Sequence, residues 1–229
     1  MSTALEASGP RSTLRTGRVS GQTWRVIAPQ LVYLAIALSA FGGYGYIRGT
    51  VRGETSPNRV TWSLWSVEGL LGFGVELQQH VGIASLMTLM LGLVPCAIVL
   101  ASFKNPHAVW KIGPFDLVCG AIALAGLVFW AFVNEPTVAL VSFVCADQVA
   151  GLPTLRKSWL DPATESSRIF VMGCLNCVIT VLTLKVLTTA GALYPGCVAV
   201  TDFVMATVII SRVGPRFRGE SAVVSRSRS

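Results

Sequence analysis

Charged side chains are scarce in this sequence. Only 13% of its 229 residues are Asp, Glu, Lys or Arg, whereas 52% are hydrophobic; an ordinary soluble domain has roughly 25% charged residues. A soluble chain of this length needs charges over its whole surface, but lipid removes that need because it replaces water around the molecule. The shortage therefore excludes an ordinary soluble domain and indicates an integral membrane protein.

Histidine and the motifs of common enzyme classes are also scarce. The two histidines, His80 and His107, lie in connections between apolar segments. The sequence has neither G-x-x-x-x-G-K-[ST], which binds nucleotide phosphates, nor H-E-x-x-H, which binds a catalytic zinc ion, and no serine nucleophile motif stands out. We therefore expect no enzyme activity, no catalytic residue, no metal site and no cofactor.

The cysteines do not follow the pattern of an extracellular disulfide framework. All six fall inside apolar segments, at Cys96, Cys119, Cys145, Cys174, Cys177 and Cys197. Disulfide frameworks staple small, loop-rich domains, so we interpret these residues as small apolar side chains. Cys174 and Cys177 form a C-x-x-C pair, a pattern that can indicate redox work or metal binding. An intramembrane redox enzyme is therefore an alternative, although no second pair or histidine cluster accompanies this one.

Seven apolar segments account for most of the chain. Each has about 18 to 23 residues, and they cover residues 27–47, 60–77, 81–103, 115–133, 137–155, 169–187 and 190–210. At ~1.5 Å rise per residue, a helix of this length matches a hydrocarbon core of roughly 30 Å. We predict an all-α, polytopic membrane protein with seven transmembrane helices.

The basic residues lie in the tails and in the connections, and the net charge is +7. Seven spans place the termini on opposite sides, with 13 Lys and Arg on the side of the C-terminus and five on the other. The positive-inside rule then predicts a cytoplasmic C-terminus and an external N-terminus. Four arginines before the first segment oppose this orientation: Arg11, Arg15, Arg18 and Arg25. A cleaved signal peptide is the rival interpretation, but its apolar stretch is normally shorter than residues 27–47.

The placement of the basic residues also indicates the partners. A nucleic-acid-binding protein concentrates Lys and Arg on a folded face, whereas here they lie in tails and loops. We therefore expect anionic lipid headgroups as a partner, and no nucleic acid; a homo-oligomer stays open. Arginine outnumbers lysine 14 to 4, which favours a GC-rich bacterial genome and hence a bacterial plasma membrane.

The segments are spaced as a duplication. The first three segments recur at an offset of about 108 residues as the last three, and residues 115–133 stand alone between them. At this offset Gly43 meets Gly151 and Arg48 meets Arg156. A single extra span gives two three-span units the same direction through the membrane. Regular spacing can also follow from bilayer thickness alone, but the matched residues favour parallel repeats arranged as 3+1+3.

This duplication defines the predicted domain organisation. The first three-helix repeat covers residues 25–111, the linker helix 112–133 and the second three-helix repeat 134–212. The basic tails, residues 1–24 and 213–229, are rich in Ser, Arg and Gly, and we expect them to be disordered.

The arrangement resembles the SWEET and PQ-loop superfamily of membrane transporters, which includes bacterial PnuC-like relatives. The segment that carries the resemblance is Gly151-Leu152-Pro153-Thr154-Leu155-Arg156-Lys157-Ser158-Trp159, followed by Pro162 and Glu165-Ser166-Ser167. The Pro-Gln dipeptide of the family stands here as Pro153-Thr154, and the first repeat has Gly45-Tyr46 at the equivalent position. The resemblance implies transport through a path between two three-helix units.

Gly45 and Pro153 occupy matching places in the two repeats. Proline removes an amide donor and glycine loosens the backbone, so both residues are hinge candidates for helices that rock. The alternative is that both merely end a helix near the cytoplasmic surface.

Four carboxylates lie within the apolar segments: Glu68, Asp116, Asp147 and Asp202. A carboxylate inside a membrane costs several kcal/mol unless it faces protein or water, so each one is a site candidate. Asp116 is only one residue into its segment and is expected to reach the interface. Asp147 and Asp202 are candidates for a proton path.

Glu68 belongs to the most informative pattern. Trp65, Glu68, Gly69 and Gly72 share one helix stripe, and the offset pairs Glu68 with Asn176 on an equivalent stripe. We predict that Glu68 and Asn176 face each other across one cavity and bind the solute. Close packing through small residues, with the polar groups joining helices, is the alternative.

Two tryptophans precede Glu68 on the same segment. Trp62 and Trp65 are predicted to shape the pocket, because an aromatic face can stack on a ring-shaped solute. An interfacial aromatic belt is the alternative for Trp62.

These patterns lead to two functional hypotheses. The first is a transporter or facilitator of a small polar solute, such as a sugar, nucleoside or vitamin precursor, that works by alternating access. The second is a membrane scaffold or sensory subunit that transports nothing and docks partners through its basic tails.

Overall fold

The computed structural model describes residues 31–78, 80, 82–105, 110–183 and 188–217. In these ranges the chain forms α-helices and 3-10 turns and no strand. The α-helices are α1 (Leu31–Arg52), α2 (Arg59–Gln78), α3 (Ser85–Ser102), α4 (Pro114–Phe132), α5 (Pro136–Leu160), α6 (Ser167–Thr183) and α7 (Thr189–Ser211), and the 3-10 turns are η1 (Gly82–Ala84) and η2 (Pro162–Thr164). The prediction of an all-α protein is confirmed.

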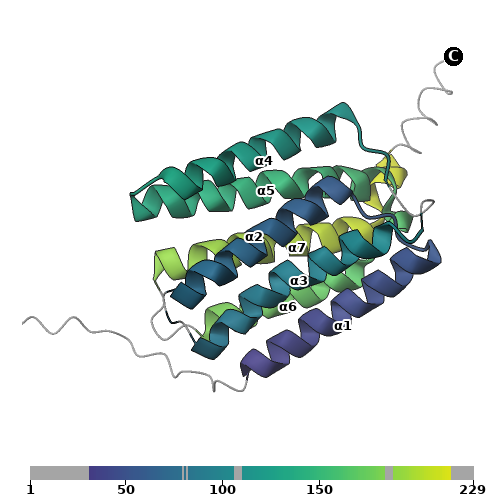
Figure 1. Ribbon diagram of the computed structural model, residues 1–229. Coiled ribbons are helices and arrows are strands. Elements are labelled where there is room, and N and C mark those ends of the chain that lie inside the picture. Colours follow the sequence, from purple (N-terminus) through teal and green to yellow (C-terminus); the bar gives the residue numbers. More distant parts are fainter. Residues whose placement is uncertain (1–30, 79, 81, 106–109, 184–187, 218–229) are drawn as a thin grey trace, which may run out of the picture.

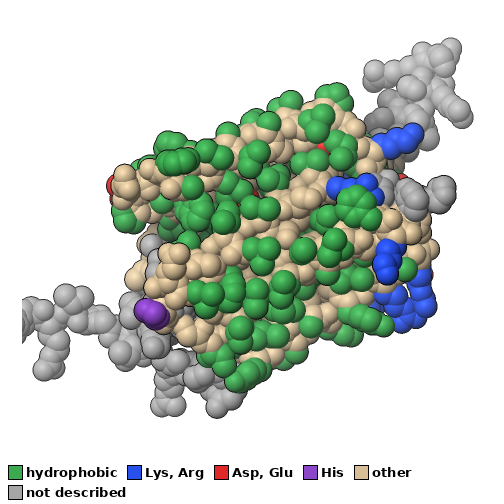
Figure 2. Space-filling model, viewed as in Figure 1, with side chains coloured by type: hydrophobic (Ala, Val, Ile, Leu, Met, Phe, Trp, Pro, Cys, Tyr) green, Lys and Arg blue, Asp and Glu red, His purple; other side chains and the backbone are tan. Residues whose placement is uncertain are grey.

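Several helices have the length and composition of membrane spans. By these two criteria five can cross a bilayer, namely α1, α3, α4, α5 and Gly191–Ser211 of α7. Apolar side chains are spread over the whole face drawn in Figure 2, and many large ones are exposed, among them Phe132 at 80% and Ile210 at 65%. Such a surface is expected where lipid is the solvent, so the chain has the features of a membrane-embedded protein.

Most helices begin and end within a few residues of the bounds of the predicted apolar segments. The clearest differences are the carboxyl ends of α1 and α5, which continue to Arg52 and Leu160, beyond the apolar segments that end at residues 47 and 155. These last turns are polar but buried: Thr50, Lys157 and Ser158 are all 0% exposed. Hydropathy cannot detect such a turn, because its residues are polar although they are buried.

The helices form a bundle (Figure 1), and the first three and the last three helices pack in the same way. Helix α3 packs between α1 and α2, and α7 packs between α5 and α6. Helices α1, α2 and α3 thus form one group, and α5, α6 and α7 form a second. The two groups meet where α1 packs on α6 and where α2 packs on α5. Helix α4 lies on the outside of the bundle against α5, with a smaller contact to α2.

Glycines allow a close approach of α2 and α3. A Cβ atom added at Gly69 of α2 would overlap the backbone of Gly92 in α3, and one added at Gly92 would come within 2.7 Å of the Leu70 nitrogen. The Ser66 hydroxyl donates a hydrogen bond to the Gly92 carbonyl oxygen at 3.1 Å. Backbone contact through small residues is the usual way in which helices associate in lipid.

The largest buried apolar cluster joins the two groups of helices. It combines Tyr46 of α1, Trp62 of α2 and Ile98 of α3 with Phe170 of α6 and Met205 of α7. The rings of Trp62 and Phe170 lie 6.4 Å apart between centroids, and those of Tyr46 and Trp62 lie 4.9 Å apart. The two groups of helices therefore share one core.

The described basic residues gather at one end of the bundle, which we call the basic end (Figure 2). It contains the carboxyl ends of α1, α3, α5 and α7 and the starts of α2, α4 and α6. Its Lys and Arg residues are Arg48, Arg52, Arg59, Lys104, Lys111, Arg156, Lys157, Arg168, Arg212 and Arg216. His80 lies at the opposite end.

A buried ion pair holds the basic end together. Lys157 Nζ lies 2.7 Å from Glu165 Oε1, and both side chains are 0% exposed. The ammonium also donates to the carbonyl oxygens of Ser56 and Thr164, and the Tyr46 hydroxyl donates to Glu165 Oε2 at 2.8 Å. This network ties the loop that follows α1 to the loop that follows α5.

The tails lie largely outside the described residues. The predicted disorder of residues 1–24 falls wholly outside them. Residues 213–217 form a further helical turn after α7, where we expected disorder from residue 213 onward, and Phe217 stacks on Trp159 with ring centroids 6.1 Å apart.

Candidate functional site

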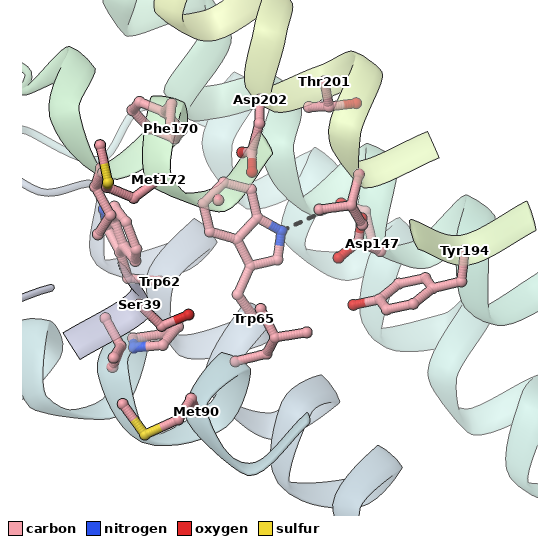
Figure 3. A pocket seen from close by; sticks show the side chains of 16 residues that line it. Ser39, Trp62, Trp65, Met90, Asp147, Phe170, Met172, Tyr194, Thr201 and Asp202 are labelled. Atoms are coloured by element: carbon pink, nitrogen blue, oxygen red, sulfur yellow. Dashed lines mark hydrogen bonds between the residues drawn. The ribbon is translucent and has the colours of Figure 1, made fainter. Parts of the chain in front are cut away.

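A cavity of about 110 Å³ lies inside the bundle. This is several times the roughly 10–15 Å³ that one water molecule requires. Residues of α1, α2, α3, α5, α6 and α7 line it, so both groups of helices contribute to its wall. Figure 3 shows the lining side chains from close by.

Most of the wall is apolar or aromatic. Trp62 and Trp65 of α2 lie edge to face with ring centroids 5.2 Å apart, and Phe170 of α6 is beside them. Met90 of α3 and Met172 of α6 also line the cavity. Trp62 and Trp65, which were predicted to shape a pocket, both line this cavity.

The polar part of the wall is built around Asp147 of α5. Its carboxylate accepts a hydrogen bond from Gln148 Nε2 at 2.8 Å, and Gln148 Oε1 accepts one from the Thr201 hydroxyl of α7. The backbone oxygen of Asp147 accepts a hydrogen bond from Trp65 Nε1 at 3.4 Å. Tyr194 of α7 interacts electrostatically with Asp147, and both side chains line the cavity (Figure 3).

Asp202 of α7 supplies the second lining carboxylate. Gly173 of α6 leaves the space that this group occupies, since a Cβ atom at Gly173 would overlap the Asp202 carboxylate. Asp147 and Asp202 interact electrostatically. The two residues predicted for a proton path therefore lie on one cavity.

Glu68 and Asn176 are buried but are not among the residues that line this cavity. Their exposed fractions are 1% and 2%, so neither faces outward. Glu68 lies within electrostatic reach of Asp147, whereas Asn176 Nδ2 donates a hydrogen bond to the Ser39 hydroxyl of α1 at 2.7 Å. Glu68 lies behind Asp147 and Asn176 lies behind Ser39, and both of these partners line the cavity. Glu68 and Asn176 therefore do not face each other across the cavity, in contrast to the prediction.

These two pairs of residues are related by the sequence offset. Ser39 and Asp147 both line the cavity, and they are 108 positions apart, as are Glu68 and Asn176. The contact between α1 and α6 at Ser39 and Asn176 therefore corresponds to the contact between α5 and α2 at Asp147 and Glu68. Sequence reasoning could have found Ser39 by applying the offset to Asp147, but no signal marked Tyr194 or Thr201.

The hinge candidates lie within helices rather than at their ends. Gly45 is inside α1 and Pro153 is inside α5, each seven residues before the last residue of its helix. Pro153 is buried, and a Cβ atom at Gly45 would lie 3.2 Å from a guanidinium nitrogen of Arg168. The alternative that both residues end a helix is wrong.

Asp116 has a structural role at the start of α4. Its carboxylate accepts a hydrogen bond from the Gly113 amide at 2.6 Å and one from Asn58 Nδ2 at 3.1 Å. It caps α4 and joins that helix to the loop before α2, at the basic end of the bundle.

The C-x-x-C pair does not belong to a metal cluster. Cys174 and Cys177 are free thiols, and in the part of the chain that the structure describes no group of three or more His, Cys, Asp or Glu side chains could hold a metal ion.

Comparisons with family models, curated proteins and solved structures gave no match to this chain. The resemblance to the SWEET and PQ-loop superfamily therefore stays a prediction from sequence.

Proposed function

We propose that the protein is a multi-pass membrane transporter or facilitator that moves a small polar solute through the cavity between two three-helix units. The observation that carries this proposal is the cavity, which combines buried carboxylates with aromatic walls and is lined by helices of both groups. Ionisable groups inside a membrane protein typically mark a solute or ion path, because burying them without a function is costly.

The proposal requires all seven helices to cross the bilayer. Two of them, α2 and α6, do not meet the length and hydropathy criteria over their described residues, where the apolar part of α6 is Ser167–Leu182. Helix α2 is less apolar because it contains Thr61, Ser66 and Glu68, all of which are buried. Its exposed side chains include Val67, Leu70, Leu71 and Leu77. A helix that turns polar groups inward and apolar groups outward fits a spanning role.

The packing order supports the 3+1+3 arrangement. If α1, α2 and α3 are exchanged with α5, α6 and α7, every contact between those helices described above maps onto another: α1 with α3 onto α5 with α7, α2 with α3 onto α6 with α7, and α1 with α6 onto α5 with α2. Helix α4 is left as the linker. Trp62 and Phe170, which are 108 positions apart, meet at the centre. Duplicated units that enclose a site at their interface are the common design of transporters.

Alternating access is the mechanism that this arrangement favours. Gly45 and Pro153 lie inside α1 and α5 at equivalent positions, and a small rotation of each helix about these residues can open the path toward either side. The proposal includes that the protein transports a solute and does not catalyse a reaction. It also includes that the protein belongs to the SWEET and PQ-loop superfamily.

The charge distribution favours an orientation in a bacterial plasma membrane. The basic end is proposed to face the cytoplasm, as the positive-inside rule requires. This places the C-terminus inside and the N-terminus outside, and it brings the arginines of the loops close to anionic lipid headgroups.

Counterflow in proteoliposomes tests the proposal. Purified protein is reconstituted, and uptake of labelled sugars, nucleosides, vitamin precursors and small amines is measured against the same compounds loaded inside. At least one solute should accumulate transiently, and Asp147→Asn should reduce its uptake at least tenfold. Glu54→Gln is the control, since Glu54 is 64% exposed and lies outside the cavity. Absence of counterflow across the panel would favour the scaffold hypothesis.

A further inference from the structure

The polar groups of the cavity have an excess of negative charge. Asp147 and Asp202 line the wall, and Glu68 lies behind Asp147. The three carboxyl groups come from α5, α7 and α2, and Asp147 interacts electrostatically with both of the others. They are not gathered as a metal site, since the described residues contain no such cluster. Two of the carboxyl groups therefore line the cavity, and the third lies behind one of them.

The described part of the chain offers no positive side chain to balance them. None of the lining residues is Lys, Arg or His, and the described Lys and Arg residues lie at the basic end (Figure 2). The buried ammonium of Lys157 is already paired with Glu165. Neighbouring carboxylates without a cation repel each other strongly in a medium of low dielectric constant, so the cavity favours either bound protons or a bound cation.

Glu68 is the carboxyl group of this set that the protein compensates least. Its side chain is 1% exposed, and neither of its oxygens accepts a hydrogen bond from an N–H or hydroxyl group of the described residues; its partner there is the carboxyl group of Asp147. Its acidic neighbour Asp147 faces the cavity. An uncompensated buried carboxyl group is costly, and a positive group next to Asp147 would reduce that cost for both residues.

The rest of the wall favours an organic cation over a hydrated metal ion. Trp62, Trp65, Phe170 and Tyr194 present aromatic rings, and aromatic faces attract ammonium and guanidinium groups within about 6 Å of the ring centre. Met90 and Val94 add apolar surface. An alkyl group beside a positive nitrogen matches a wall that is apolar on one side and acidic on the other.

We propose that the cavity binds a small organic cation, an alkylammonium or guanidinium compound, between the carboxylates of Asp147 and Asp202 and the rings of Trp62 and Trp65. As a statement about the transported solute, this inference rests on the proposed function. As a statement about binding, it is independent of transport.

A thermal-shift experiment on purified protein tests the binding. Choline and methylguanidinium are the probes, and 3,3-dimethyl-1-butanol is the neutral control because it has the shape of choline without the charge. Potassium chloride at equal ionic strength controls for salt. We expect at least one cation to raise the unfolding midpoint in a concentration-dependent way, and the neutral analogue to raise it at least tenfold less effectively. Equal stabilisation by the neutral analogue, or none by either cation, overturns the inference.

Variants show whether the carboxylates bind the cation. Asp147→Asn and Asp202→Asn preserve side-chain shape, and each should weaken the binding at least tenfold, whereas Glu54→Gln should leave it unchanged. If one Asn variant does not give monodisperse protein, the other carries the test. Unchanged binding in a folded Asn variant overturns the inference.

Binding and counterflow together separate the two proposals. Cation binding without counterflow of any compound contradicts the transport function and supports the site. Counterflow of a neutral sugar or nucleoside with no cation binding supports transport and overturns the organic-cation site.

Discussion

Lys157 and Glu165 form a charge pair that is fully enclosed by protein. Both side chains are 0% exposed, and the ammonium donates to Glu165 and to two loop carbonyl oxygens. Removing one member of a buried pair leaves an uncompensated charge, which is far more costly than losing a pair at the surface. The pair of Arg52 and Glu54 is the natural contrast, since it is 4.0 Å long and its side chains are 53% and 64% exposed.

Lys157→Met should therefore lower the free energy of unfolding by about 3–5 kcal/mol. Arg52→Gln, which breaks the exposed pair, should change it by less than about 1 kcal/mol. The measurement is denaturant unfolding in detergent at neutral pH. The double variant Lys157→Met with Glu165→Gln should recover part of the loss, because the buried charge is then gone. Equal effects of Lys157→Met and Arg52→Gln would contradict this account of the basic end.

Glu135 contributes to stability at the opposite end through a cap on α5. Its carboxylate accepts hydrogen bonds from the Val138 and Thr137 amides at 2.6 and 3.1 Å. These bonds hold the pKa of Glu135 below its usual value. Since the charged form is the one that is stabilised, the contribution is present above the unfolded pKa and is lost as the pH falls through the folded pKa.

Glu135→Ala should accordingly be less stable than the wild type at about pH 7, and the difference should diminish as the pH is lowered below about 4. Thermal unfolding across this pH range measures it. Glu135→Gln is the control, because its amide oxygen can accept the same bonds without titrating, so its stability relative to Glu135→Ala should not change in this window. A pH-independent difference between wild type and Glu135→Ala would show that the cap does not depend on charge.

At the scale of helices, the contact between α2 and α3 depends on a lack of side chains. Gly69 and Gly92 bring the two backbones together, whereas Gly74 of the same helix has nothing within 4 Å of an added Cβ atom. Alanine substitutions at Gly69 and at Gly74 of α2 therefore separate the effect of packing from the intrinsic preference of alanine for a helix.

Gly69→Ala should destabilise the protein by about 1–3 kcal/mol through overpacking against Gly92. Gly74→Ala should be neutral or stabilise it by up to about 1 kcal/mol, because alanine is the better helix former. Both are measured by thermal unfolding in the same detergent. Equal effects at the two positions would mean that α2 and α3 do not approach closely at Gly69.

The helices were largely predictable, and the site was predictable in part. Apolar length located all seven, but it could not place the ends of α1 and α5, because their last turns contain buried polar residues. Thr50 bonds to Thr55, and Lys157 bonds to the loops that follow α1 and α5. Burial cost identified Asp147 and Asp202, and both line the cavity. The offset paired Glu68 with Asn176, yet it did not reveal that each lies behind a residue that lines the cavity. That detail depends on helix rotation, which the sequence pattern does not determine.

At the scale of the whole molecule, the direction of the chain through the membrane can be tested with two loops. Lys104 lies at the basic end, and Asn134 lies at the opposite end, between α4 and α5. Both side chains are exposed. In a variant without native cysteines, a membrane-impermeant thiol reagent added to intact cells should label Asn134→Cys and should label Lys104→Cys only after the cells are opened. The reverse pattern would place the basic end outside and contradict the proposed orientation.

The central claim is that water from both sides of the membrane reaches the cavity between the two three-helix units. The most direct measurement is the labelling of Thr201→Cys by an impermeant thiol reagent in the cysteine-free background, in right-side-out and inverted vesicles. Thr201 lines the cavity, whereas the adjacent Val200 is 64% exposed on the outer surface of α7, where lipid is expected. The account predicts that Thr201→Cys is labelled from either side and that Val200→Cys is labelled from neither. Labelling of Thr201→Cys from one side only, or from no side, would contradict it.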